Sequence, residues 1–123
     1  MEQLQQMSGS ERQIMEFVWA AERPVTTREI LRNLDSSKAW KQSTVITFLT
    51  RLIEKHIVKA TRVGKANFYE PRISQQEYLL FETRQFIRDV HKGSTKGFLS
   101  ALCDIGDLTE RDIAELIARV KDR

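Results

Sequence analysis

The sequence predicts a mainly α-helical protein with one small β-hairpin wing, in two domains that cover residues 1–72 and residues 73–123. Three observations predict this fold class. Apolar residues recur at helical spacing up to residue 56, they alternate over residues 57–71, and helical spacing returns after Pro71. A chain of 123 residues suits one compact domain, or a small domain of about 70 residues plus an extension that needs a partner.

Composition and cysteine content narrow the class of protein. With 41% hydrophobic and 30% charged residues the chain is globular, and its apolar stretches are too short and too often interrupted by charge to span a membrane. No signal pattern precedes them, so we expect a cytoplasmic protein without membrane insertion. The single Cys103 excludes an intrachain disulfide and forms no common metal-site spacing with His56 and His91. We expect no cofactor, and we expect Cys103 to be a buried thiol, with an intersubunit bridge as the alternative.

Capping-box patterns predict where the first two helices begin. Ser8 with Glu11, or Ser10 with Gln13, can cap a helix that continues through an apolar stripe to Trp19. "VTTREILRNL" repeats the device, because Thr26 can cap and Glu29 can reach back to it.

The third helix lies within "STVITFLTRLIEKHIV", residues 43–58, and has an unusual outward face. At 100° per residue one side carries Val45, Phe48, Leu49, Leu52 and His56. The other carries Ser43, Thr47, Thr50, Arg51 and Glu54, flanked by Thr44 and Ile46. The apolar side can therefore fill the core without the hydroxyl side chains.

A basic hairpin follows this helix. Gly64-Lys65 suits a type II′ turn, which would pair Val63 with Ala66 and Arg62 with Asn67. Residues 38–72 hold 8 Lys and Arg against only Glu54 and Glu70, so the positive charge is concentrated there. Three helices followed by a basic hairpin are the outline of a winged helix-turn-helix domain.

In the C-terminal part, the apolar spacing predicts three helices, and we expect these helices to form a dimer. The first has Ser74 and Glu77 as its capping box and ends at Gly93, and it is apolar on two sides because Tyr78 and Phe81 lie opposite the main stripe. About 50 residues are near the limit of independent stability, so dimerisation is expected. The expected dimer contacts are Leu79, Leu80, Phe86, Ile87, Val90, Phe98, Leu99, Leu102, Ile113, Leu116, Ile117 and Val120.

No catalytic constellation stands out, so an enzyme is not expected. Short hydroxyl side chains suit a helix that enters a DNA major groove about 12 Å wide, and cations at its start and on the wing suit phosphates. The candidate DNA contacts are Lys38, Lys41, Gln42, Ser43, Thr44, Ile46, Thr47, Thr50, Arg51, Arg62 and Lys65. Two alternatives stay open: Arg51 could pair with Glu54 instead, and the whole face could bind a partner protein.

Three segments resemble the penicillinase repressor family, the BlaI/MecI/CopY-type winged-helix transcriptional regulators: "SERQIMEFVW", "STVITFLTRLIEKHIV" and "RVGKANFYEP". The most specific pattern, T-V-x-T-x-L-x-R-L-x-x-K, reads here as Thr44, Val45, Thr47, Leu49, Arg51, Leu52 and Lys55. The resemblance implies a homodimeric repressor of a palindromic double-stranded operator, in this family that of a β-lactam-resistance operon. It also implies derepression when a membrane sensor protease of the BlaR/MecR type leads to cleavage in the dimerisation domain.

Three positions depart from the family pattern. Ile46 stands where close relatives often have Arg, and His56 stands where the family usually has Gly, so His56 must adopt a left-handed cap or end the helix differently. The family's Asn-Phe cleavage point falls at Ala101-Leu102. The copper-responsive branch is disfavoured because its cluster of C-terminal cysteines is missing.

Overall fold

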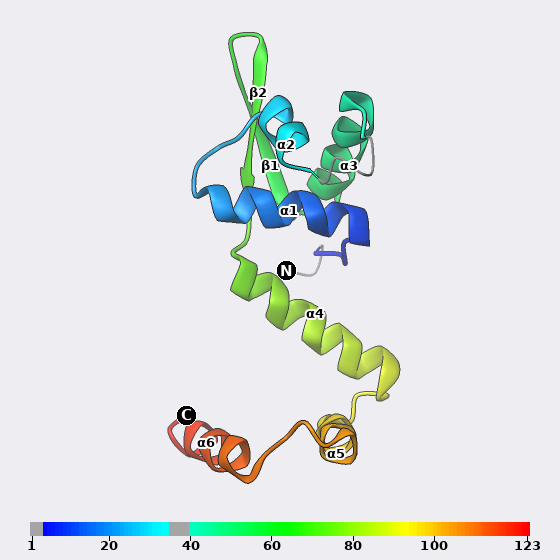
Figure 1. Ribbon diagram of the computed structural model, residues 1–123, viewed down its shortest axis with the longest axis vertical. Coiled ribbons are helices and arrows are strands. Elements are labelled where there is room, and N and C mark those ends of the chain that lie inside the picture. Colours follow the sequence, from blue (N-terminus) through cyan, green and yellow to red (C-terminus); the bar gives the residue numbers. More distant parts are fainter. Residues whose placement is uncertain (1–3, 35–39) are drawn as a thin grey trace. The chain divides into compact units, whose positions relative to one another are not determined.

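The computed structural model describes residues 4–34 and 40–123, and these residues confirm the predicted fold class (Figure 1). The elements are α1 (Gly9–Ala21), α2 (Thr27–Asn33), α3 (Gln42–Glu54), β1 (Val58–Val63), β2 (Ala66–Pro71), α4 (Gln75–Val90), α5 (Thr95–Ile105) and α6 (Glu110–Lys121). They divide into two compact units, Met1–Leu80 and Phe81–Arg123. None of the helices in the described ranges is both long enough and apolar enough to cross a bilayer.

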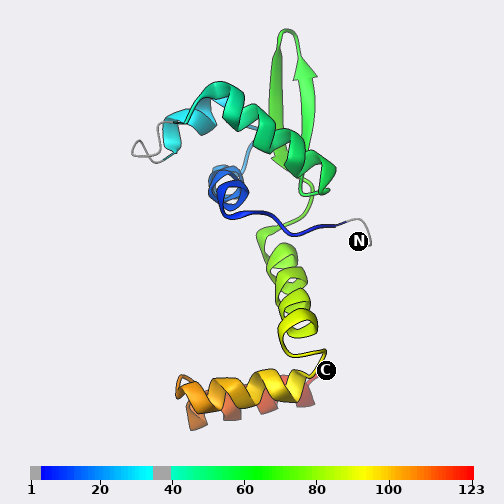
Figure 2. The same ribbon diagram turned by 90° about the vertical axis from the view of Figure 1, so that its right-hand side faces the viewer.

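The first unit is a three-helix core with a hairpin at its edge. Ile14, Val18, Ile30, Val45 and Leu49 are completely buried where α1, α2 and α3 meet. The segment before α2 joins the hairpin, because Val25 and Tyr69 exchange two backbone hydrogen bonds of 2.9 and 2.7 Å. Figures 1 and 2 both show the tip of the hairpin extending beyond these helices.

The predicted caps form, and all of them lie in the first unit. Ser8 caps α1 in a reciprocal box with Glu11, which decides between the two expected starts, and Thr26 does the same for α2. Each box satisfies amides that the first helical turn leaves without partners. Ser74 exchanges the equivalent bonds with Glu77 at the start of α4.

The hairpin has the predicted register and turn. Arg62 pairs with Asn67 and Val63 with Ala66. Gly64 has a φ of 63°, whereas Lys65 keeps a negative φ, as a type II′ turn requires. All residues from Lys59 to Asn67 are exposed, so neither face of the wing is buried in the protein.

The first unit extends beyond residue 72, where we expected the first domain to end. Ile73 and Tyr78 are both buried within it, so the first turn of α4 belongs to the winged helix. The buried side of α4 is thus the one that carries Tyr78.

The second unit contains the end of α4 with α5 and α6. Ser94 caps α5, and Thr109 caps α6 in a box with Asp112. The expectation of a buried Cys103 is wrong for the single chain, because the thiol is exposed on α5. Helical spacing placed Cys103 next to apolar neighbours, but it could not show that no other described part of the single chain packs against this side of α5.

Candidate nucleic-acid interface

The outward face of α3 is exposed and is uncharged from Ser43 to Thr50, with Arg51 and Glu54 following at its C-terminal end. Ser43, Thr47 and Thr50 are exposed, and Ile46 between them is 42% exposed. Val45, Leu49 and Leu52 are completely buried on the opposite side, and Thr44 is half-buried between the two. The core contacts of α3 are therefore complete without the hydroxyl face.

The two threonines of this face point their hydroxyl protons back at the helix. Thr47 Oγ1 donates to the carbonyl of Ser43 at 3.0 Å, and Thr50 Oγ1 donates to the carbonyl of Ile46 at 2.9 Å. A hydroxyl that has donated its proton keeps its acceptor lone pairs. Each side chain thus presents an acceptor oxygen and a methyl group in a fixed rotamer.

The start of α3 carries a lysine at its N-cap. Lys41 is the N-cap, but its side chain makes no capping hydrogen bond, and Lys41 and Gln42 are both exposed. Backbone amides at a helix N-terminus attract negative charge, and the Lys41 ammonium adds to that field. Lys38, the other expected cation here, lies outside the described residues.

One of the two alternatives for Arg51, the ion pair with Glu54, is not observed among the described residues, and the other, a phosphate contact, stays a prediction. The guanidinium carbon of Arg51 lies 5.5 Å from the centre of the Phe48 ring. Stacking of this kind holds the stem of the side chain and leaves guanidinium donors for another acceptor. Trp40 packs against the same ring in a tilted arrangement, with the two ring centres 5.4 Å apart.

The wing adds two cations at its tip. Arg62 and Lys65 are exposed on either side of the Gly64 turn, and Val63 between them is 60% exposed. Lys59, nearer the base, pairs with Glu70 at 3.4 Å. Free positive charge is therefore concentrated at the tip.

Two features position the end of α3, and sequence reasoning missed the first. Glu11 is only 1% exposed and accepts from Lys55 Nζ at 2.6 Å, which links the start of α1 to the end of α3. Lys55 is the last residue of the family pattern, so in this fold that lysine is a packing residue. The capping box with Ser8 already explained the Glu11 carboxylate, so nothing in the sequence suggested a second partner. The one available signal was that Glu11 lies away from the solvated face of α1.

The second feature is the cap that ends α3. His56 adopts the left-handed conformation at φ 65°, and the amides of His56 and Ile57 donate to Ile53 and Leu52 at 3.0 Å. This pair of bonds is a Schellman motif, usually built on glycine. His56 Nδ1 also lies 2.9 Å from Arg72 Nη1 at the base of the wing.

The expected dimer contacts lie on surfaces that the single chain leaves uncovered. Leu79 and Leu80 are exposed in the first unit. In the second unit, Phe86, Val90, Leu99, Ile113, Leu116, Ile117 and Val120 are exposed, and Ile87, Phe98 and Leu102 are half-buried. An apolar groove of about 450 Å³ within this unit brings some of them together: Leu99, Leu108, Ile113, Leu116, Ile117, Val120 and Lys121.

The expected cleavage point lies in the middle of α5. Ala101 and Leu102 are both half-buried in this helix. Over the residues described, no group of three or more His, Cys, Asp or Glu side chains is placed to hold a metal ion.

Three packed helices, the third of which exposes one face, and a basic hairpin define a winged helix-turn-helix protein. The chain belongs to the penicillinase repressor family, whose model matches residues 7–122. It is 24% identical to the penicillinase repressor of Bacillus licheniformis over 116 residues, which cover 94% of this chain and 90% of that protein. It is 22% identical to the methicillin resistance regulatory protein MecI of Staphylococcus aureus strain N315 over 90% of this chain and 89% of that one. These relatives are regulators and not enzymes.

Solved structures agree with this assignment. The solution structure of monomeric Bacillus licheniformis BlaI in complex with the blaP half-operator covers 61% of this chain and 90% of its own, with 28% identity and a TM-score of 0.51. The solution structure of the DNA-binding domain of the repressor BlaI covers 59% and 88%, with 28% identity and a TM-score of 0.50.

Proposed function

We propose that the chain is a homodimeric transcriptional repressor in which α3 enters the major groove of one half of a palindromic operator. The observation that carries this proposal is the exposed, uncharged face of Ser43, Ile46, Thr47 and Thr50 on a helix that completely buries Val45, Leu49 and Leu52 on its other side. A groove about 12 Å wide accepts short side chains against base edges.

The hydroxyl geometry supports readout of particular base atoms. Because Thr47 and Thr50 have donated their protons to helix carbonyls, their oxygens can only accept, and the amino groups of adenine and cytosine are the donors in the major groove. Ile46 beside them favours an apolar contact such as a thymine methyl group. Ser43 and Thr44 complete the base-facing set.

The surrounding cations suit the phosphates on either side of such a groove. Lys41 and Gln42 lie at the start of α3, Arg51 lies along it, and Arg62 and Lys65 lie at the wing tip. Their contacts with phosphate oxygens would fix orientation without reading sequence.

Dimerisation through the second unit is supported by its lack of a core. No side chain among residues 81–123, all of which are described, is buried in the single chain. Val120 is 70% exposed on one side of the apolar groove. An apolar surface of this kind is stable in water when a second copy covers it, and a dimer also matches the two halves of a palindrome.

Derepression is proposed to act through the same unit. By analogy with the named relatives, the operator controls a β-lactam-resistance operon, and a membrane sensor protease of the BlaR/MecR type leads to cleavage at Ala101-Leu102. Because this bond lies inside α5, the helix must unwind locally before it is cut. Cleavage separates α6 from the rest and uncouples the half-sites. Intact-mass measurement on the chain from its host, before and after a β-lactam is added, tests this step, and an uncut chain after derepression would reject it.

A salt titration separates DNA binding from the alternative of a protein-protein module. The full chain is titrated into labelled duplex DNA that includes its own promoter region, starting at about 50 mM salt. For a repressor, the logarithm of the affinity falls linearly with that of salt, with a slope of roughly 0.9 for each phosphate neutralised. Absence of binding at the lowest salt would reject the repressor and favour the protein-protein module.

A further inference from the structure

The first turn of α4 is anchored in the winged helix by one buried tyrosine. Tyr78 is 2% exposed, and its phenolic oxygen accepts a hydrogen bond of 2.8 Å from the backbone amide of Met7. Met7 and Leu4 are themselves buried, so the segment before α1 packs over this part of the molecule. A buried amide is costly to leave without an acceptor, which makes this contact specific.

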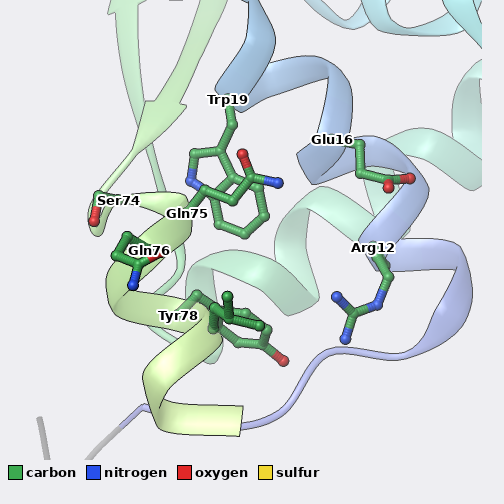
Figure 3. Close-up of a pocket in the computed structure, with 8 residues that line it drawn as sticks. Arg12, Glu16, Trp19, Ser74, Gln75, Gln76 and Tyr78 are labelled. Atoms are coloured by element: carbon green, nitrogen blue, oxygen red, sulfur yellow. The ribbon is translucent and has the colours of Figure 1, made fainter. Parts of the chain in front are cut away.

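Trp19 of α1 forms a second anchor beside the first. Its indole Nε1 donates to the carbonyl of Ile73 at 3.0 Å, and its ring centre lies 5.9 Å from that of Tyr78 at an interplanar angle of 41°. Figure 3 shows both aromatic side chains lining one open pocket of about 500 Å³, with Trp19 coming from α1 and Tyr78 from α4. The guanidinium of Arg12 adds a third contact, 5.9 Å from the Tyr78 ring centre.

The connection between the wing and α4 has no slack. Of its three residues, Arg72 donates its amide to the Ile57 carbonyl at 2.9 Å, Ile73 is buried, and Ser74 caps the helix. A short connection with every residue held cannot act as a flexible hinge.

The same anchor reaches the end of the recognition helix. Two residues before Met7, the amide of Gln5 donates to the carbonyl of Lys55 at 3.3 Å, and Lys55 is the C-cap of α3. The start of α4 and the end of α3 are therefore tied to one short segment of chain. Directly after that first turn of α4, Leu79 and Leu80 remain exposed, and Leu80 is 61% exposed.

We propose that Trp19 and Tyr78 are positioning residues that fix α4 on the winged helix and thereby set the half-site spacing that the dimer accepts. The inference rests on the proposed function, because only a dimer that binds both half-sites has a spacing to set. An anchor on the first turn of α4 restricts the directions in which the rest of that helix can leave the winged helix, so a dimer formed through it accepts a narrow range of half-site separations. A loosened anchor would tolerate a wider range.

The test compares spacing tolerance with half-site affinity. The wild-type chain first selects a palindromic duplex from a random pool, and two base pairs are then inserted between its halves, which rotates one half by roughly 70°. We expect wild type to bind the selected spacing roughly tenfold or more tighter than the altered one. In the double variant Trp19→Phe, Tyr78→Phe this ratio falls to about threefold or less, while affinity for an isolated half-site stays within about twofold. Gln76→Ala, on the exposed side of the same turn, should keep the wild-type ratio.

The outcomes separate the inference from the function on which it rests. If wild type selects no duplex, the proposed function fails and the inference fails with it. If the double variant keeps the wild-type spacing ratio, Trp19 and Tyr78 have only a structural role and the inference alone is overturned. If the double variant also loses half-site affinity, the single variant Tyr78→Phe is measured instead, since it removes one acceptor and keeps the ring. A lower spacing ratio with unchanged half-site affinity then supports the inference, and an unchanged ratio overturns it.

Discussion

At the scale of single residues, Thr47 has the geometry that the proposed base contact requires. Its hydroxyl proton is bound to the Ser43 carbonyl, so the side chain is held in one rotamer with an acceptor and a methyl group outward. A fixed short side chain loses little conformational entropy on binding. Lys65, in contrast, is a flexible point charge at the wing tip.

Substitution of these two residues should weaken DNA binding in different ways, one dependent on the DNA sequence and the other independent of it. Thr47→Ala should cost roughly 1–3 kcal/mol on the selected operator and little on random DNA, because it removes a base contact. Lys65→Ala should weaken both alike, because it removes a phosphate contact. Fluorescence anisotropy on the two duplexes measures both changes, and equal losses on both duplexes after Thr47→Ala would mean that α3 only orients the protein.

Lys55 predicts an effect on stability. Lys55→Met leaves the Glu11 carboxylate buried without its cation, which should lower the free energy of unfolding by roughly 3 kcal/mol. Lys59→Met is the matched control, because Lys59 is exposed and Glu70 is only half-buried, so their pair should be worth about 0.5 kcal/mol or less. Urea denaturation measures both variants. Equal small losses would show that the Glu11–Lys55 pair does not hold α1 to α3.

At the scale of elements, local patterns predicted most of what formed. The capping boxes at Ser8, Thr26 and Ser74 and the register about Gly64 involve groups within a few residues of one another, so the sequence contains the whole interaction. The left-handed His56 was one of two outcomes that the sequence allowed, and the amides of the Schellman motif show why it is tolerated.

The cap of α6 predicts a pH dependence. The Thr109 backbone amide, followed by its hydroxyl, holds the pKa of Asp112 below its ordinary value. A carboxyl whose pKa is lower in the folded state stabilises that state above its unfolded pKa, and this contribution disappears as the pH falls through the folded value. Asp112→Asn should therefore lower the thermal midpoint near pH 6, and the difference should shrink at acid pH as the folded carboxyl becomes protonated. An unchanged difference at acid pH would exclude the carboxylate as its source.

At the scale of the whole molecule, the contacts that the sequence did not predict are those between residues far apart along the chain. Periodicity identified the apolar faces of the helices, but it could not show that Tyr78 bonds to the Met7 amide or that Lys55 reaches Glu11. These contacts join residues 71 and 44 positions apart, and no local pattern encodes them. For the same reason the end of the first unit was predicted too early, and the exposure of Cys103 was missed.

The division at Leu80 also determines where the chain can be shortened. A cut after Pro71 would remove the buried Ile73 and Tyr78 from the winged helix, whereas a cut after Leu80 keeps them. Residues 1–80 should therefore fold as a monomer, and sedimentation equilibrium should show a dimer only for the full chain. A monomeric full chain at micromolar concentration would contradict the role assigned to α4, α5 and α6.

The most direct test of the homodimeric repressor compares the full chain with residues 1–80 on two duplexes, the selected palindrome and one half of it. Both proteins should bind the half-site equally, because α3 and the wing are the same in each. The full chain should bind the palindrome roughly 100-fold or more tighter than residues 1–80, because the dimer binds both half-sites at once. Equal affinity of the two proteins for the palindrome would contradict the account.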